Sequence, residues 1–171
     1  PLTSRAPVLA AAVRVVSQGQ EVRELMNGQV AEVEVAARNT GNLDAEQVTA
    51  RVSSREAGVV FERDRETIGR LSAGGESMPL RFEFGLSRVF GNDRLSLTVE
   101  LSQRDFPGRV ERLELPVKVR RPVLAASSNV IGRQGGRVIE QNETADLEVR
   151  VVNTGNLAAE GVTVGIDVKG P

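Results

Sequence analysis

The pentapeptide Asn-Thr-Gly-Asn-Leu occurs twice in this chain, at residues 39–43 and, 114 positions later, at residues 153–157. The residues that follow recur as well, because Ala-Glu-x-Val-Thr stands at 45–49 and again at 159–163. A period of this length is that of a whole domain, since the units of solenoid proteins measure about 20–50 residues. The chain is therefore predicted to contain repeated domains, as modular proteins that connect or present other parts do.

The repeat also fixes where the copies are expected to begin. The segment Pro-Val-Leu-Ala-Ala at residues 7–11 returns at 122–126, directly after a short Arg-Arg linker. Residues 1–120 are thus predicted to form one full domain, which is long enough to bury a core of its own. Residues 121–171 are predicted to be the first strands of a second, incomplete copy.

Alternation of apolar and polar residues is the dominant pattern within each copy. Residues 31, 33, 35 and 37 are Ala or Val, and the residues that alternate with them include Glu32, Glu34 and Arg38. This period of two is typical of a strand with one buried face. The same phase returns at residues 145–151, and a slip of one residue in either copy would turn the apolar set toward water.

Further strands are expected from the same pattern, with turn residues between them. They lie within 8–16 and near 48–52, 59–62, 80–86, 95–101 and 113–119. Residues 21–26 are the single weak candidate for a helix, with a loop as the alternative. About seven short strands in the first domain predict an all-β, immunoglobulin-like antiparallel sandwich, with about three strands in the partial copy.

The composition argues against several classes of function. The chain has no cysteine and no histidine, so thiol chemistry, disulfides and the commonest general base and metal ligand are absent. Phenylalanine is the sole aromatic type, which disfavours stacking sites for sugars or bases. A net charge of −1 without a basic run disfavours nucleic acid, and no stretch is apolar enough for a membrane span. We expect no catalytic residue, no cofactor and no metal.

The repeated turn is the first candidate site. A polar loop that recurs could bind a ligand or Ca²⁺, but it offers too few oxygen donors for that ion. The structural interpretation is favoured: the asparagine amides bond nearby backbone where the strand leaves the sheet, and the glycine adopts a positive φ. The residues concerned are Asn39, Gly41 and Asn42, with Asn153, Gly155 and Asn156 in the second copy.

Two other segments are candidates for a contact loop and for a pair of catalytic carboxylates. Phe106 and Pro107 stand at the tip of an expected hairpin, where an exposed ring can anchor a partner or can fold back onto the sandwich. The acidic residues within 62–66 alternate with arginines. Paired carboxylates can hydrolyse glycosides, but mixed charges on an exposed edge strand are the expected arrangement here, because they deter edge-to-edge pairing.

The order of these signals resembles the bacterial cell-adhesion-related domain, an immunoglobulin-like family. An alternating strand runs into Asn-x-Gly at residues 33–41, Ala-x-x-Val follows at 45–48, and a glycine-containing turn precedes a strand at 68–82. The resemblance covers most of residues 7–120 and returns in part from residue 122. It implies tandem, non-catalytic domains in an extracytoplasmic location: the periplasm, the cell surface or the medium.

Three classes of function follow. The favoured hypothesis is a non-catalytic module of a larger bacterial extracytoplasmic protein, serving as a spacer or a protein–protein interaction or adhesion domain. The alternative is a ligand-binding accessory domain that recognises glycans on behalf of a secreted or surface enzyme. An enzyme is the third class, without support from any spacing of residues. A protein partner is expected, and the incomplete second copy suggests self-association, because unpaired strand edges attract other chains.

Overall fold

The computed structural model describes residues 5–132, 142 and 144–167, so parts of the predicted second copy (133–141, 143 and 168–171) lie outside the described residues. The chain divides into two compact units, Pro1–Val119 and Arg120–Pro171, here called unit 1 and unit 2. Among the described residues, no helix is long and apolar enough to cross a membrane.

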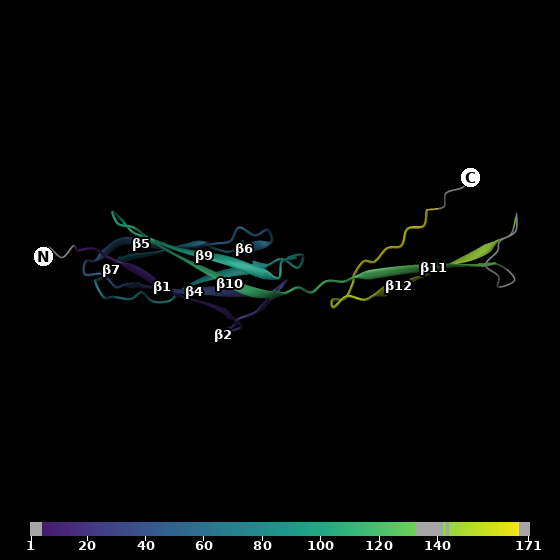
Figure 1. Cartoon of the computed structure of the whole chain (residues 1–171), viewed down its shortest axis with the longest axis horizontal. Helices are drawn as coiled ribbons and strands as arrows, with labels where there is room; N and C mark the ends of the chain where they lie inside the picture. The colour runs from purple at the N-terminus through teal and green to yellow at the C-terminus, as the bar shows by residue number, and fades with distance from the viewer. Residues whose placement is uncertain (1–4, 133–141, 143, 168–171) are drawn as a thin grey trace. The chain divides into compact units, whose positions relative to one another are not determined.

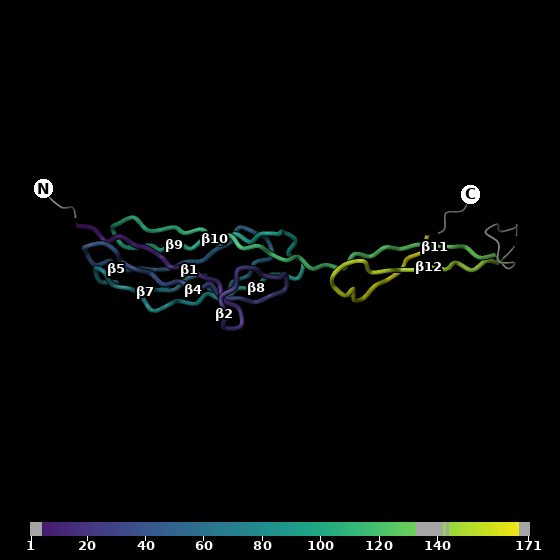
Figure 2. The backbone as a smooth tube through the Cα atoms, turned by 60° about the horizontal axis from the view of Figure 1, so that its bottom comes forward, coloured from purple at the N-terminus to yellow at the C-terminus, as the bar shows by residue number. Residues whose placement is uncertain are grey.

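Unit 1 is a sandwich of two five-stranded sheets (Figures 1 and 2). The first sheet has the strand order β2-β1-β4-β8-β6, with bounds β1 (Leu9–Ser17), β2 (Gln20–Glu21), β4 (Val30–Asn39), β6 (Val59–Phe61) and β8 (Leu80–Leu86). The second has the order β3-β10-β9-β5-β7, with bounds β3 (Leu25–Met26), β5 (Ala45–Ser53), β7 (Arg65–Leu71), β9 (Arg94–Ser102) and β10 (Arg109–Lys118). All pairings are antiparallel except that of β3 with β10.

The core lies between the two sheets and consists of the inward residues of each alternating strand. On β4 these are the predicted alanines and valines, each at most 3% exposed. They face β5 and β9 residues such as Val52 and Leu97, which are fully buried. Phe82 and Phe84 of β8 supply the largest side chains. Aliphatic side chains and a few phenylalanines thus fill the core of a sandwich that has no disulfide.

The all-β sandwich is as predicted, but unit 1 has ten strands within residues 5–119 instead of about seven. The sequence pattern did not reveal β2, β3 or β7. The helix considered for residues 21–26 is wrong, because the segment runs from the end of β2 through three residues without regular structure into β3. Leu25 is 1% exposed and pairs in parallel with Val117 of β10, so a long-range contact sets its conformation.

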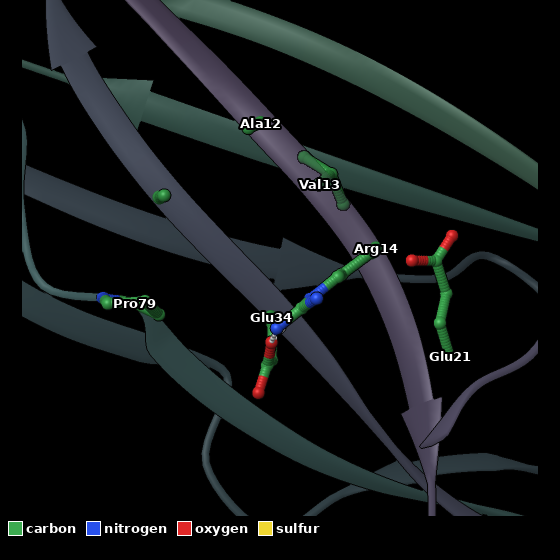
Figure 3. Close-up of a pocket in the computed structure, with 7 residues that line it drawn as sticks. Ala12, Val13, Arg14, Glu21, Glu34 and Pro79 are labelled. Carbon is green, nitrogen blue, oxygen red and sulfur yellow. Dashed lines mark hydrogen bonds and ion pairs between the residues drawn. The ribbon is translucent and has the colours of Figure 1, made fainter. Parts of the chain in front are cut away.

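Glu34 is a second difference from expectation. Its predicted outward phase on β4 is correct, yet its side chain is only 6% exposed. Arg14 of β1 donates its Nε–H to the carboxylate at 2.6 Å (Figure 3). Arg81 of β8 lies 3.1 Å from the same carboxylate. The two arginine side chains cover Glu34 from the neighbouring strands, so an outward residue in a central strand is hidden from water.

The described part of unit 2 forms a single antiparallel pair, β11 (Leu124–Gly132) and β12 (Ala145–Asn153). The third strand expected there does not form, since residues 158–167 carry no strand. Val162, Val164 and Ile166 remain 44–59% exposed. In unit 1 the corresponding strand, β5, is held between β7 and β9, and the described part of unit 2 has no strands equivalent to these two.

Candidate functional site

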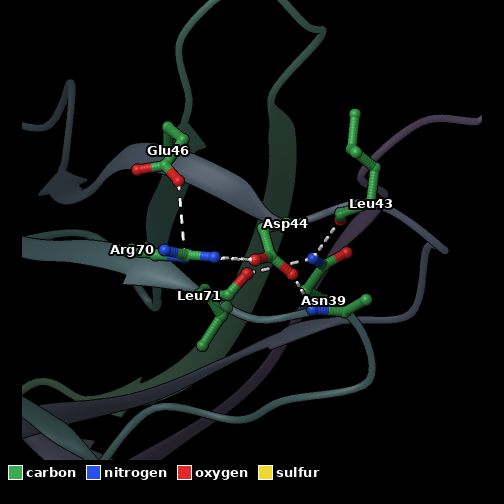
Figure 4. A network of polar contacts seen from close by, with 7 residues as sticks. Asn39, Leu43, Asp44, Glu46, Arg70 and Leu71 are labelled. Atoms are coloured by element: carbon green, nitrogen blue, oxygen red, sulfur yellow. Dashed lines mark hydrogen bonds and ion pairs between the residues drawn. The ribbon is translucent and has the colours of Figure 1, made fainter.

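Asn39 organises the turn at which the chain crosses from the first sheet to the second. It ends β4 and is fully buried. Its Oδ1 accepts hydrogen bonds from the backbone N–H of Val8 (3.1 Å) and of Gly41 (3.0 Å). Its Nδ2 donates to the carbonyls of Leu43 (2.8 Å) and Leu71 (3.1 Å) (Figure 4). The amide therefore uses its full bonding capacity and joins the start of β1, the crossover and the end of β7.

The same turn holds the chain that enters unit 1. Thr40 donates its backbone N–H to the carbonyl of Val8 at 2.8 Å. Asn42 bonds Ala6 twice, accepting from its N–H through Oδ1 at 3.0 Å and donating to its carbonyl at 3.2 Å. We call residues 39–42, with their equivalents 153–156, the entry turn. Its role is to fix the path of the chain before the first strand of the unit.

Gly41 is needed for a different reason from the one expected. The sequence suggested a positive φ, but Gly41 is not among the glycines that adopt one. Instead, a Cβ at this position would lie 2.2 Å from the carbonyl oxygen of Ala6 and 2.6 Å from the nitrogen of Val8. The entering chain thus passes so close that no side chain fits between.

Unit 2 repeats this geometry. Asn153 accepts from Val123 N–H at 3.1 Å and from Gly155 N–H at 2.9 Å, and it donates to Leu157 O at 2.7 Å. Asn156 accepts from the N–H of Arg121 at 2.8 Å. A Cβ on Gly155 would lie 2.3 Å from Arg121 O. The entry turn therefore forms on a two-stranded sheet, although the described residues of unit 2 form no second sheet.

The six predicted turn residues thus come together in two equivalent sites. Their partners are the residues just before the first strand of each unit, and no prediction from the sequence named them. A signal for them was present: the segments at 7–11 and 122–126 recur with nearly the same spacing as the asparagine turns. Two segments that recur together are candidates for contact with each other.

Beside the entry turn of unit 1, Asp44 forms a small charged network (Figure 4). Its carboxylate pairs with the guanidinium of Arg70 and accepts the backbone N–H of Ala73 at 2.8 Å. Arg70 also lies 3.4 Å from Glu46. The hydrogen bond from Arg70, followed by that from Ala73, lowers the pKa of Asp44, and the pKa of Arg70 is raised in turn.

Asp44 contributes to the stability of unit 1, and we expect this contribution to decrease at low pH. Because its folded pKa is depressed, the contribution is fully present above the unfolded value of about 3.9 and is lost as pH falls through the folded pKa. A carboxyl-carbon NMR titration should place the midpoint of Asp44 below that value, and Arg70→Ala should move it upward. A midpoint that does not respond to Arg70→Ala would contradict this assignment.

The other two candidate segments occupy ordinary surface positions. Phe106 is half-buried and Pro107 is exposed. Phe106 helps to line an open hollow of about 430 Å³ next to Asn42 and Asp44. In the acidic segment 62–66, Asp64 pairs with Arg51 and Glu66 pairs with Arg63. Within the described residues, no group of three or more Asp or Glu side chains is placed to hold a metal ion.

Comparisons with known proteins bear on the fold alone. No protein-family model matches the sequence, and no curated protein matches it. Among solved structures, the CARDB domain of a Pyrococcus furiosus protein, in complex with di-metal ions, is 15% identical. The match covers 69% of this chain and 94% of that chain with a TM-score of 0.47.

Two structures of α-2-macroglobulin from Escherichia coli match with higher TM-scores. The crystal structure spanning domain MG7 to the C-terminus is 12% identical, with 75% of this chain and 20% of that chain covered and a TM-score of 0.55. The cryo-EM reconstruction of the native conformation is 9% identical, with 71% and 7% covered and a TM-score of 0.54. This chain thus spans a small part of those proteins, and the likeness confirms the immunoglobulin-like fold.

Proposed function

We propose that this chain is a non-catalytic immunoglobulin-like module of a larger bacterial extracytoplasmic protein, serving as a structural spacer or a protein–protein interaction domain. One observation supports the proposal: in both units the entry turn forms the same hydrogen bonds to the backbone that precedes the first strand. Because the turn fixes the backbone path just before the first strand of each unit, it limits how freely one unit can reorient relative to the next. Such a restriction suits a protein in which the domains act as spacers.

The length of chain between the units supports a spacer with limited freedom. β10 ends at Lys118, and the entry turn of unit 2 already bonds Arg121. Two residues, Val119 and Arg120, separate these points. Because the reach and freedom of a linker grow with its length, so short a connection restricts the orientations that the two units sample.

The alternative, glycan recognition, lacks an aromatic platform. The five phenylalanines are the chain's whole aromatic content, and all lie within the described residues. Phe82, Phe84 and Phe90 are buried, while Phe61 and Phe106 are half-buried. The proposed extracytoplasmic location is supported by the family resemblance of the sequence and is compatible with the absence of cysteine.

The proposal is tested by measuring how independently the two units tumble, using ¹⁵N NMR relaxation. We expect the wild-type units to share one rotational correlation time. Gly155→Ala should separate the two times, because the new Cβ would displace Arg121 and Val123 from the entry turn. Gly165→Ala is the matched control, since a Cβ there meets no atom within 4 Å. Independent tumbling in the wild type, or equal effects of the two substitutions, would refute the spacer mechanism.

A further inference from the structure

The dipeptide Asn-Gly occurs once in this chain, at Asn27 and Gly28 between β3 and β4. Asn-Gly is the pair most prone to deamidation, because glycine has no side chain to hinder its backbone nitrogen. Gln29 donates its backbone N–H to the carbonyl of Met26 at 3.2 Å, and Gly28 has a φ of 80°. These residues therefore form a β-turn with glycine at the position that requires a positive φ. We call residues 26–29 the Asn27 turn.

Deamidation of an Asn-Gly pair begins at the backbone nitrogen of the glycine. This nitrogen loses its proton and attacks Cγ of the asparagine, so that a C–N bond forms. The bond between Cγ and Nδ2 breaks, and Nδ2 takes up one proton and leaves as ammonia. Water then opens the cyclic imide, either at Cγ, which gives aspartate, or at the backbone carbonyl carbon, which gives isoaspartate. Water is the one co-reactant, but the glycine N–H and the asparagine amide must both be free to react.

In the folded chain, hydrogen bonds hold both of these groups. Gly28 donates its N–H to the carbonyl of Leu86 at 3.0 Å and to that of Ser87 at 3.2 Å. Asn27 donates from Nδ2 to the carbonyl of Arg88 at 2.6 Å. Three consecutive carbonyls at the end of β8 thus hold the attacking nitrogen and the group that has to leave. Attack on Cγ requires these hydrogen bonds to break first.

The segment that supplies the carbonyls is itself anchored in unit 1. Phe90 is 3% exposed and donates its N–H to the carbonyl of Ser87 at 3.0 Å. Leu86 donates its N–H to the carbonyl of Gln29 at 2.9 Å, which is a further bond to the Asn27 turn. Release of Gly28 therefore requires a local unfolding event, and such events occur with a free-energy cost.

We propose that Asn27 is a deamidation site that the closed Asn27 turn protects, so that its conversion records an opening of this end of unit 1. The conversion is irreversible because ammonia is lost. The product cannot restore the original contact, since an ionised aspartate accepts hydrogen bonds but donates none. Its oxygen would face the carbonyl oxygen of Arg88, to which Nδ2 now donates. This inference does not rest on the spacer role.

The position of the turn gives this record a meaning. Met26 of β3 pairs with Lys118, the last residue of β10, so the Asn27 turn adjoins the point at which the chain leaves unit 1. Loosening of β10 there removes the pairing that holds β3. Deamidation of Asn27 should therefore report on the end of the unit that bears any pull on the chain that follows.

Gln18→Asn supplies a matched control within the same chain. It creates a second Asn-Gly pair in the exposed turn between β1 and β2, followed by the same glycine and glutamine as Asn27. Gln18 already has a φ of 52°, a conformation in which asparagine is enriched. Among the residues that the structure describes, none accepts a hydrogen bond from the N–H of Gly19.

The test follows deamidation of both pairs in the Gln18→Asn chain by peptide mass spectrometry. In native buffer we expect position 18 to deamidate about tenfold faster than Asn27 or more, because several hydrogen bonds must first break at Asn27. In concentrated urea the two rates should converge, since the local sequences match and both turns are unfolded. Equal rates in buffer, whether both fast or both slow, overturn the proposal.

Asn27→Asp reproduces one product directly and tests whether conversion prevents reclosure. We expect hydrogen exchange of the Gly28 and Phe90 amides to become about tenfold faster than in the wild type, because a donor is lost and a charged acceptor faces a carbonyl. Asn27→Ala is the control, which removes the donor without adding a charge, and it should have a smaller effect. Wild-type exchange in Asn27→Asp would contradict the claim that the product leaves the turn open.

Discussion

Replacing Asn39 with alanine should lower the free energy of unfolding of unit 1 by about 3 kcal/mol. The side chain is fully buried and satisfies four backbone groups, which belong to Val8, Gly41, Leu43 and Leu71. Each polar group left without a partner in a buried site costs about 1–3 kcal/mol, and water can reach part of this site. Urea unfolding followed through the NMR signals of unit 1 measures the loss separately from unit 2.

The matched control for this prediction is Asn42→Ala. Asn42 belongs to the same turn, but the bond that its side chain makes within the described residues is to an exposed backbone N–H, that of Ala6. We expect it to cost about 1 kcal/mol or less, since an exposed group regains its hydrogen bond from water. If Asn39→Ala were no more destabilising than Asn42→Ala, the buried amide would not be the organising group of the turn.

Gly41→Ala is the substitution with the next largest expected effect, about 2–4 kcal/mol on unit 1. A Cβ at 2.2 Å from the carbonyl oxygen of Ala6 cannot be accommodated without moving the backbone, and forcing extra atoms into a packed site is destabilising. The displaced chain also carries Val8, whose N–H bonds Asn39. The same urea experiment on unit 1 measures this loss.

Gly85→Ala separates this steric cost from the general effect of removing a glycine. Gly85 lies in β8, and a Cβ there meets no atom within 4 Å. We expect its stability to stay within about 0.5 kcal/mol of the wild type or to rise slightly, because glycine weakens a strand interior. Similar losses from Gly41→Ala and Gly85→Ala would show that close approach of the entering chain is not what requires Gly41.

Long alternating segments made much of unit 1 predictable. β4, β8 and β9 each present four or more apolar residues at every second position, so one face had to be buried. β7 was not predicted because it shows no regular alternation of apolar residues. It lies at the edge of its sheet, where charged residues such as Arg65 are exposed. β2 and β3 are two residues long and therefore too short to show any period.

The site was predictable in part. The recurrence of Asn39 and Gly41 marked the entry turn, and the inward phase of β4 placed the asparagine at the core. The sequence could not show that the entering chain passes against Gly41, because this contact joins segments more than 30 residues apart. It could not show the burial of Glu34 either, because the arginines that cover it come from β1 and β8.

The sequence by itself determined the fold class, the repeat and the faces of the longer strands, because alternation and turn residues act between near neighbours along the chain. Tertiary structure alone decided the conformation around Leu25, the burial of Glu34 and the reason for Gly41, because each depends on atoms brought in from distant strands. The same division holds in unit 2. Its paired strands keep their register, while residues 162–166, patterned like β5, form no strand where the described residues supply no neighbouring strands to bond them.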